Sequence, residues 1–573
     1  MVSFSMARTR ATAIALLSLS QIVNAIDSAS FDSGTYGSDE ETPYQSFTSS
    51  PQITPPELLI YSNTSSAITD GYVFIGVDGT SDSGQMGPCI YDMSPGDRMG
   101  TLVWTGMDYN KTFDVSLQTY KGEPVMTFFN GTLLDGFGHG SYYILNQSYS
   151  EIMHFSPVGY PNLGDLHEFR ITDDDTALVT LYIVQQADLT TVNGTEDGYI
   201  YECAFQEIDI ETGELIFMWN ATDHVALNET YNDIGSAGDE STPFDWFHIN
   251  SVTKDDDGNY LISSRTTWTL YKIDGSTGEI IWRLHGRNSD FEVTDADFHW
   301  QHNARWTDTA AQKYITIFDN QGDDDDTYSR GMLLAVDQDA MTVTLEQEFH
   351  NGDSTYSKYE GNLQCLNCSD LSSTNWFQGY GNQPYFTEFS ADGTVVLDVQ
   401  FAVDNAINSY RAYKYPLTSW VGQPTTNPNI SWDTSANSVY FSWNGATEVE
   451  TWEVYTADTA NSSADWTKVA SATRTGFETL VDVSDSDLST YVRGKALDSS
   501  GSILGLSDAT DGSNFYTLGD ESTPTSSSSS TGASAAAESS ATSTDDSDSA
   551  AIIMAPGIMM GVSLIGMALG LVL

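Results

Sequence analysis

Three histidines and one arginine stand out among the residues of this sequence that could carry out chemistry. The chain has only nine histidines, and His167, His248 and His302 each come just before or at the start of a strand-like run. Arg265 lies between the last two, and a lone cation beside imidazoles in so acidic a chain favours an anionic ligand. The candidate site residues are His167, His248, Asn250, Arg265, His302 and Asn303.

This set of side chains suits the transfer of a sulfuryl group. A neutral imidazole nitrogen can approach an anionic group and is a strong nucleophile near neutral pH. Arginine can hold two oxygens through parallel hydrogen bonds and offset charge in a loose transition state, by analogy with phosphoryl transfer. A second histidine can protonate the departing oxygen, which matters for a phenolate of pKa about 10. A single histidine is more often a structural residue, so the chemistry depends on the three converging.

The elements that must bring them together are strands. Short runs rich in Val, Ile, Thr, Tyr and Phe alternate with Asp-Gly, Asn-Gly and Thr-Gly turns, without long amphipathic helical patterns after residue 25. One hairpin recurs at residues 208–219 and 273–282, each closed by Thr-Gly-Glu and ending in Trp219 or Trp282. The repeat predicts an all-β fold, a six-bladed β-propeller, with a sandwich as the competing architecture. Inner strands of successive blades would line a common channel where the histidines meet.

After Pro424 the chain changes to a compact run of alternating strands, which predicts a small fibronectin type III-like β-sandwich with Trp443 and Trp452 in its core. The expected organisation is a signal peptide at 1–25, an N-terminal extension at 26–56, the propeller at 57–424, the sandwich at 425–519, a Ser/Thr/Ala-rich disordered stalk at 520–549 and a hydrophobic tail at 550–573.

Both ends of the chain predict a route to the cell surface. Arg8 and Arg10 precede an apolar run, as in a secretory signal. No Lys or Arg follows Lys495, which favours a GPI-anchor signal over a transmembrane helix for the tail. We expect the protein on the extracellular face of the plasma membrane or in the cell wall, touching the membrane only through this C-terminal anchor.

The composition narrows the range of partners. The chain has 21 Lys and Arg against 80 Asp and Glu, for a formal charge of -59. Such a field repels nucleic acid and anionic membrane surfaces, so neither is expected to bind. Ten Asn-x-Ser/Thr sequons predict a secreted glycoprotein.

No metal site is expected. The four cysteines are Cys89, Cys203, Cys365 and Cys368, and a loop disulfide explains the Cys-x-x-Cys pair better than half of a zinc site. The run Asp323–Asp326 favours a solvated loop over a calcium site, because no EF-hand spacing accompanies it.

Several segments resemble the arylsulfotransferase family, in its eukaryotic secreted branch: "DWFHINSV", "LISSR", "IDGSTGEIIWRL", and "QHNAR" followed by "ITIFDNQ". The resemblance implies a six-bladed propeller enzyme that passes sulfate from a small phenolic sulfate donor to a phenolic acceptor, without a nucleotide cofactor. It also implies that His302 is the histidine that becomes sulfated and that His248, Asn250 and Arg265 bind and polarise the sulfuryl group. His167 then matches a further pocket histidine, and we expect Asn303 at the substrate as well.

Two positions depart from the family pattern. Asn303 follows His302 where the family usually has Asp, and Glu168 rather than Asp follows His167. If the acid raises the basicity of the imidazole, Asn303 can only orient the ring, and activity would fall or disappear. The alternative is a non-catalytic cell-wall or adhesion propeller that binds glycans or aromatic ligands. The oligomeric state is not predicted.

Overall fold

The computed structural model describes residues 44–517, except for 65, 80–85, 135, 322–327, 352–354 and 405. The predicted signal peptide, the Asp323–Asp326 run, the stalk and the hydrophobic tail lie outside the described residues. The described part is almost wholly β-structure, with 35 strands and five short 3₁₀ helices. It contains no helix long and apolar enough to cross a membrane.

Six sheets of four or five strands follow one another between residues 59 and 415. The first three contain β2 (Tyr72–Gly79), β3 (Gly87–Asp92) and β4 (Thr101–Thr105); β5 (Thr112–Tyr120), β6 (Glu123–Leu133), β7 (Gly138–Leu145) and β8 (Glu151–Phe155); and β9 (Phe169–Ile171), β10 (Thr176–Ala187), β11 (Gly198–Asp209) and β12 (Leu215–Asn220). The next three contain β13 (Ile249–Lys254), β14 (Tyr260–Ser264), β15 (Thr269–Ile273) and β16 (Ile280–Leu284); β18 (His302–Trp306), β19 (Tyr314–Asp319), β20 (Arg330–Asp337) and β21 (Thr342–Phe349); and β22 (Asn362–Cys365), β23 (Trp376–Gly379), β24 (Tyr385–Phe389) and β25 (Val395–Gln400).

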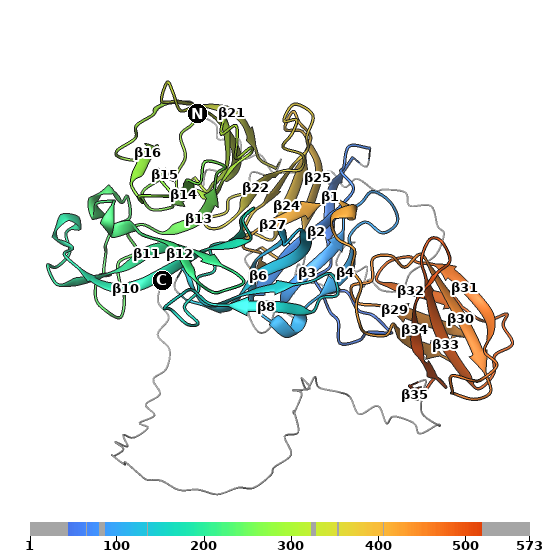
Figure 1. Cartoon of the computed structure of the whole chain (residues 1–573). Coiled ribbons are helices and arrows are strands. Elements are labelled where there is room, and N and C mark those ends of the chain that lie inside the picture. The colour runs from blue at the N-terminus through green and yellow to red at the C-terminus, as the bar shows by residue number, and fades with distance from the viewer. Residues whose placement is uncertain are drawn as a thin grey trace, which may run out of the picture. The chain divides into compact units, whose positions relative to one another are not determined.

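Strands from distant parts of the chain complete the first and last sheets. β27 (Ala412–Tyr415) pairs antiparallel with β2, so that Tyr72 lies opposite Tyr415 (Figure 1). β26 (Ile407–Asn408) also pairs with β2, and β1 (Leu59–Asn63) pairs with β25. β17 (Glu292–Thr294) adds a parallel edge to β21. The first and last sheets of this region therefore each contain strands from both its beginning and its end, which is typical of propeller-like folds.

One edge strand of each sheet lies next to its counterparts. β27 contacts β5, β5 contacts β9, β13 contacts β18, and β18 contacts β22. We call these six strands the inner strands. Because each sheet packs against a neighbour on both faces, strands such as β2 and β3 are buried along nearly their whole length.

The recurring hairpin has a defined structural role. Its two copies form the outer strand pairs β11–β12 and β15–β16, as the sequence predicts. Both tryptophans are buried, and each indole N–H reaches the outer turn of the next sheet: Trp219 donates to the Gly278 carbonyl and Trp282 to Gln338 Oε1, both at 3.0 Å. The repeat therefore fastens neighbouring sheets to each other.

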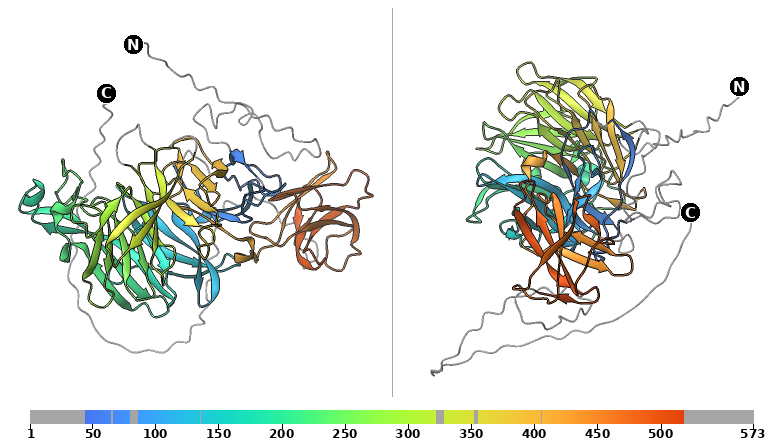
Figure 2. Two further views of the ribbon diagram at one scale, coloured as in Figure 1. Left: turned by 90° about the horizontal axis from the view of Figure 1, so that it is seen from above. Right: turned by 90° about the vertical axis from the view of Figure 1, so that its right-hand side faces the viewer.

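The last part of the described chain forms two smaller sheets, drawn in orange and red in Figures 1 and 2. Trp452 is buried between them and stacks on Phe441, with ring centroids 5.0 Å apart. Trp443, which we expected in this core, is only partly buried at its margin. The strands are β28 (Asn429–Asp433), β29 (Ser438–Ser442) and β32 (Glu478–Asp482) in one sheet, and β30 (Thr451–Ala457), β31 (Thr467–Thr473), β33 (Tyr491–Leu497), β34 (Ile503–Thr510) and β35 (Phe515–Tyr516) in the other.

All four cysteines lie in the described residues. Cys365 and Cys368 form a disulfide, whereas Cys89 and Cys203 are buried free thiols. Burial raises the pKa of the Cys89 thiol to about 12, which makes it unreactive. We therefore expect alkylation to label Cys89 and Cys203 only after unfolding, and non-reducing peptide mapping to recover a Cys365–Cys368 link. Labelling of Cys365 without reduction would contradict this pairing.

Candidate active site

The inner strands bring the three predicted histidines together. His167 precedes β9, His248 precedes β13 and His302 begins β18. The ring centroids of His167 and His248 are 4.8 Å apart, and those of His248 and His302 are 6.4 Å apart. The expected convergence at one end of the inner strands is confirmed.

The three rings line a cavity of about 670 Å³, which we call the histidine cavity. Arg265, immediately after β14, lines the same cavity. The cavity is also lined by Leu133, Leu134, Phe244, Tyr359, Glu360 and Tyr410.

Asn250 and Asn303 do not line this cavity among the described residues that surround it. Asn250 Nδ2 donates to the carbonyl of Gln301 at 2.7 Å, next to His302. With its amide oriented to satisfy both guanidinium groups, Asn303 Oδ1 accepts from Arg411 Nε at 2.9 Å and from Arg305 Nη2 at 3.1 Å. Both asparagines, predicted to touch substrate, therefore contact groups of neighbouring strands and do not border the histidine cavity.

The hydrogen bonds of His302 define its tautomer. Asn320 Nδ2 donates to two backbone carbonyls, those of Ser357 and Glu360, so Asn320 Oδ1 faces His302 Nδ1 at 2.7 Å. Nδ1 must therefore carry the proton and donate it to this oxygen. Nε2 keeps its lone pair and accepts the backbone N–H of Glu360 at 3.3 Å. The partner of His302 is Asn320, not Asn303.

The surroundings of His302 keep its ring neutral. Burial, followed by the charge of Arg265, holds the pKa of His302 well below its ordinary value, although the hydrogen bond to Asn320 acts in the opposite direction. A neutral imidazole whose Nε2 carries no proton is the form required of a nucleophile, and Nε2 must give up the hydrogen bond from the Glu360 N–H in order to attack.

The other two histidines are backed by carboxylates. His248 Nδ1 lies 2.5 Å from Asp245 Oδ2, and His167 Nδ1 lies 2.7 Å from Asp165 Oδ2. Burial alone raises the pKa of Asp245, but the charge and hydrogen bond of His248 outweigh it, and the net pKa is lowered. Each carboxylate therefore stays ionised and fixes its imidazole, leaving Nε2 as the nitrogen available to a ligand.

Arg265 is held between two aromatic rings. Its guanidinium carbon lies 4.8 Å from the centroid of Trp300 and 5.2 Å from that of Tyr359. Its backbone N–H donates to the His248 carbonyl at 2.9 Å, which ties the two candidate residues together. The arrangement presents a planar cation next to the histidines.

Four functional residues were missed in the sequence. Asp165 and Asp245 precede their histidines by two and three residues, a spacing that is visible in the sequence. Asn320 and Glu360 come from other segments and have no local signal. Burial, followed by the charge of Asp78, raises the pKa of Glu360 to about 8, which favours the neutral form of this cavity-lining carboxyl near pH 7.

A cluster of buried charges crosses the inner strands beside the histidine cavity. Arg411 Nη1 lies 2.9 Å from Asp114 and 3.2 Å from Glu168, and Arg305 Nη2 lies 2.6 Å from Glu168. Arg411 Nη2 also donates to the carbonyls of His167 and Asn250. We call Asp114, Glu168, Arg305 and Arg411 the ionic layer. Glu168 and Asn303, the two departures from the family pattern, both contact its arginines.

The fold and the site define an all-β, propeller-like protein with a histidine-lined cavity suited to group transfer. The arylsulfotransferase (ASST) family profile matches residues 116–402, and the chain belongs to this family. The match includes the three histidines, Arg265 and both predicted asparagines. Family membership suggests an arylsulfotransferase-like activity with phenolic sulfate substrates; the eukaryotic secreted branch remains a prediction.

Solved structures with detectable similarity include a protein of unknown function from Bacteroides caccae (TM-score 0.34, 11% identity, 61% of this chain and 99% of that chain). A putative 6-phosphogluconolactonase from Bacteroides fragilis has a TM-score of 0.31 and 10% identity, covering 61% of this chain and 99% of its own. A streptogramin B lyase has a TM-score of 0.26 and 10% identity over 58% of this chain and 90% of its own. No curated protein matches.

The Asn320 contact makes a prediction about pH. A carboxylate at this position stabilises the imidazolium, so Asn320→Asp should raise the pKa of His302 by about 1–3 units. Because protonated His302 cannot attack, the rate of donor-dependent labelling should begin to fall at a higher pH than in the native protein, where the lowered pKa keeps the ring neutral. The measurement is the pH dependence of single-turnover labelling.

The matched control is Asn303→Asp, which adds a carboxylate next to the ionic layer instead. This variant should not change the pH at which the labelling rate begins to fall. If both variants shifted this pH equally, Asn320 would not be the residue that controls the protonation state of His302.

Proposed function

We propose that this protein transfers a sulfuryl group from a phenolic sulfate ester to a phenolic acceptor, with His302 as the residue that is transiently sulfated. One observation carries the proposal: His302 Nε2, kept neutral and oriented through Asn320, borders the same cavity as Arg265 and two carboxylate-backed histidines. The family match supports the same reaction class.

In the first half-reaction, Arg265 binds the sulfate oxygens of the donor, and His302 Nε2 attacks the sulfur. The S–N bond forms as the ester S–O bond breaks, and the electron pair leaves with the phenol oxygen. His248 supplies the proton for that oxygen. Its pKa is lowered by burial, but an anionic donor in the cavity raises its proton affinity, and Asp245 stabilises the imidazolium.

In the second half-reaction, the acceptor phenol gives its proton to neutral His248 while its oxygen takes the sulfuryl group. The S–N bond breaks and His302 returns to its starting form. His167, whose Nδ1–H is held by Asp165 and whose ring centroid lies 4.8 Å from that of His248, is placed to accept a hydrogen bond from the acceptor hydroxyl through Nε2.

The aryl group needs apolar surface, and the cavity supplies it. Leu133 and Leu134 are unusually exposed for large apolar residues, at 40% and 38%, and both line the histidine cavity together with Phe244 and Tyr410. These residues offer the contact area for the ring of the donor or acceptor.

We also propose the finer architecture and location. The six sheets are taken as the blades of a six-bladed propeller and the last two sheets as a fibronectin type III-like sandwich, supported by the strand pairing. The N-terminal and C-terminal sequences support a GPI-anchored glycoprotein of the cell surface. Phosphatidylinositol-specific phospholipase should then release the protein from cells, and continued membrane attachment would argue against the anchor.

The test of function is incubation of the purified full chain with 4-nitrophenyl sulfate, with and without phenol. We expect nitrophenol release that depends on phenol, together with formation of phenyl sulfate. Binding of these aromatics without turnover, across a panel of aryl sulfates, would support the non-catalytic binding propeller instead.

A further inference from the structure

The inner strands lead from the histidine cavity through the ionic layer to a second pocket. Along the segment that ends in β27, Tyr410 lines the histidine cavity, Arg411 belongs to the ionic layer, and Tyr413 lines the second pocket. β18 follows the same order, from His302 to Trp306. The second pocket therefore lies at the opposite end of the inner strands from the histidines.

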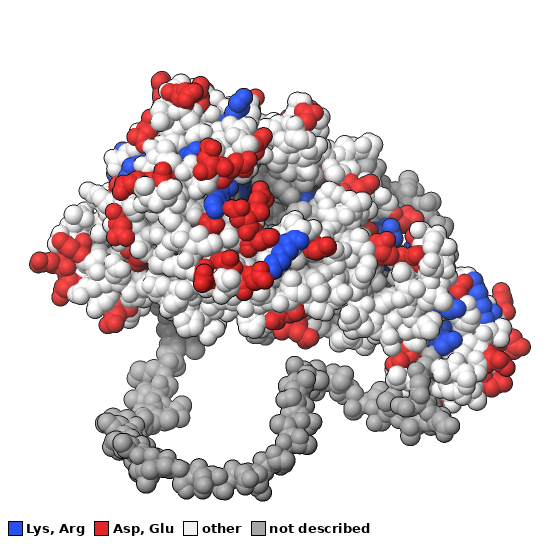
Figure 3. All heavy atoms as spheres, viewed as in Figure 1, with Lys and Arg blue, Asp and Glu red and all other residues white. Residues whose placement is uncertain are grey.

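This second pocket, which we call the lower pocket, has a volume of about 210 Å³. Two guanidinium groups and three aromatic rings line it: Arg170, Arg305, Trp306, Tyr413 and Tyr415. No carboxylate occurs among the described residues that line it, although groups of acidic side chains are scattered over the molecular face seen in Figure 3. A pocket of this size suits a ligand with a single ring.

Arg170 is the feature that points to a charged ligand. Within the described part of the chain, its guanidinium makes no hydrogen bond or ion pair, even though the protein has 80 acidic residues against 21 Lys and Arg. Arg305, by contrast, is already engaged by Glu168. The formal charge of the surrounding ionisable side chains is positive. It is +1, from three arginines (Arg170, Arg305 and Arg411) and two acids (Asp114 and Glu168).

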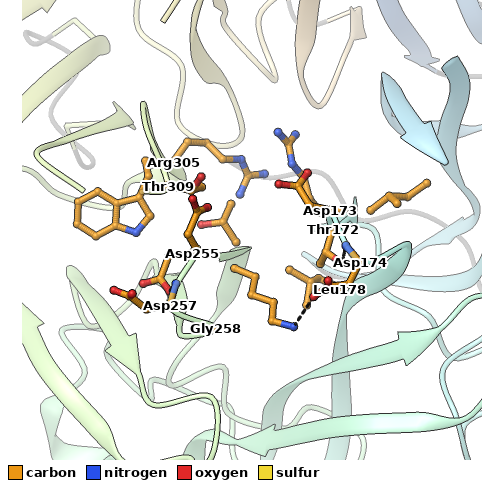
Figure 4. Close-up of a pocket in the computed structure, with 15 residues that line it drawn as sticks. Thr172, Asp173, Asp174, Leu178, Asp255, Asp257, Gly258, Arg305 and Thr309 are labelled. Carbon is orange, nitrogen blue, oxygen red and sulfur yellow. Dashed lines mark hydrogen bonds and ion pairs between the residues drawn. The ribbon is translucent and has the colours of Figure 1, made fainter. Parts of the chain in front are cut away.

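A larger cavity of about 700 Å³ adjoins the lower pocket and shares Arg170, Arg305 and Trp306 with it. Figure 4 shows Arg305 and the carboxylates of Asp173 and Asp255 around this larger space. Lys254 adds no free cation there, because it pairs with Glu207 at 2.9 Å and with Asp174 at 3.5 Å. The acidic wall disfavours anions in the larger cavity and leaves the lower pocket as the place where one is stabilised.

We propose that the lower pocket binds a small aromatic anion, whose charged group pairs with Arg170 and whose ring packs against Tyr413, Tyr415 and Trp306. A guanidinium forms two parallel hydrogen bonds with a carboxylate or sulfate group, and aromatic side chains supply the apolar contact. The site contains none of the residues of the proposed reaction, so it stands whether or not His302 transfers sulfate.

The test first removes two side chains of the histidine cavity, so that binding there is weakened. In the full chain carrying His302→Ala and Arg265→Ala, isothermal titration calorimetry should still find about one equivalent of bound benzoate or 4-nitrophenyl sulfate. The two probes distinguish a carboxylate from a sulfate ester as the preferred group. Phenol, which lacks the charge, and inorganic sulfate, which lacks the ring, should each bind at least about tenfold more weakly.

Two variants in the same background locate the site. Arg170→Met should weaken binding by about tenfold or more, whereas Arg98→Met, at an exposed arginine 3.8 Å from Asp92, should not change it. Thr307→Phe fills the lower pocket without altering charge and should also weaken binding, which keeps the test decisive if Arg170→Met does not fold. Absence of binding in the parent double variant, or equal affinity in Thr307→Phe and Arg98→Met, would overturn the proposal. If inorganic sulfate bound as tightly as 4-nitrophenyl sulfate, the proposed contact between the ligand ring and the aromatic side chains would be wrong.

Discussion

Replacement of His302 by alanine is expected to abolish donor-dependent labelling and to lower turnover by about 10³-fold or more, because the nucleophile itself is lost. In the native protein, an aryl sulfate alone should leave a sulfuryl group on the peptide that contains His302, since the first half-reaction needs no acceptor. Mass spectrometry under alkaline conditions is the measurement, because a sulfated imidazole is expected to be acid-labile. Adding phenol should discharge the label.

Two further variants separate the nucleophile from its helpers. Arg265→Ala should slow labelling by about 10²–10³-fold without eliminating it, the scale of one preorganised electrostatic contact. His248→Ala should impair donors with poor leaving groups most, because an activated nitrophenolate departs without an acid. His154→Ala, at an exposed histidine of β8 paired with Glu151, is the matched control and should have no effect. Native turnover in His302→Ala would rule out the covalent route.

The convergence of the three histidines was predictable because it depends only on strand order. Each histidine stands at the start of an inner strand, and a propeller-like arrangement places those starts together. The hairpin ending in Trp219 or Trp282 could also be predicted from the sequence, because all of its residues are close together in the chain. The contacts of Asn320 and Glu360 were not readable, because they depend on how segments far apart in the chain pack around His302.

The misplacement of Asn303 has a simple geometric cause. Successive side chains of a strand point to opposite faces, so a residue next to His302 in sequence is directed away from the ring. Asn303 also adopts a positive φ of 56°, and the pairing register of β18 with β19 shifts between His302 and Arg305. Sequence adjacency therefore suggested a partner that the strand geometry excludes, and the substitution of Asp by Asn affects the ionic layer rather than the imidazole.

The ionic layer gives the largest expected effect on stability. Arg411→Met should lower the free energy of unfolding by about 3–5 kcal/mol, the usual cost of removing one partner from a buried ion pair. It leaves Asp114 and Glu168 with less compensation and the carbonyls of His167 and Asn250 without their donor. Urea unfolding of the full chain is the measurement. Lys121→Met, at an exposed pair with Glu211, should change stability little.

The pH dependence of stability should show whether Arg411→Met destabilises the protein through the charges of Asp114 and Glu168. Burial raises the pKa of Asp114, whereas Arg305 and Arg411 outweigh burial and lower the pKa of Glu168. A lowered folded pKa means that Glu168 contributes stability above its unfolded pKa of about 4.3, and this contribution is lost as pH falls through the folded value. Arg411→Met should shrink that contribution, so the variant should be least destabilised at acid pH.

Adding Asp114→Asn to Arg411→Met should restore part of the stability at neutral pH, because it removes the charge left unpaired. A loss that is the same at every pH and is not relieved by Asp114→Asn would mean that Arg411 acts through packing and its carbonyl contacts alone.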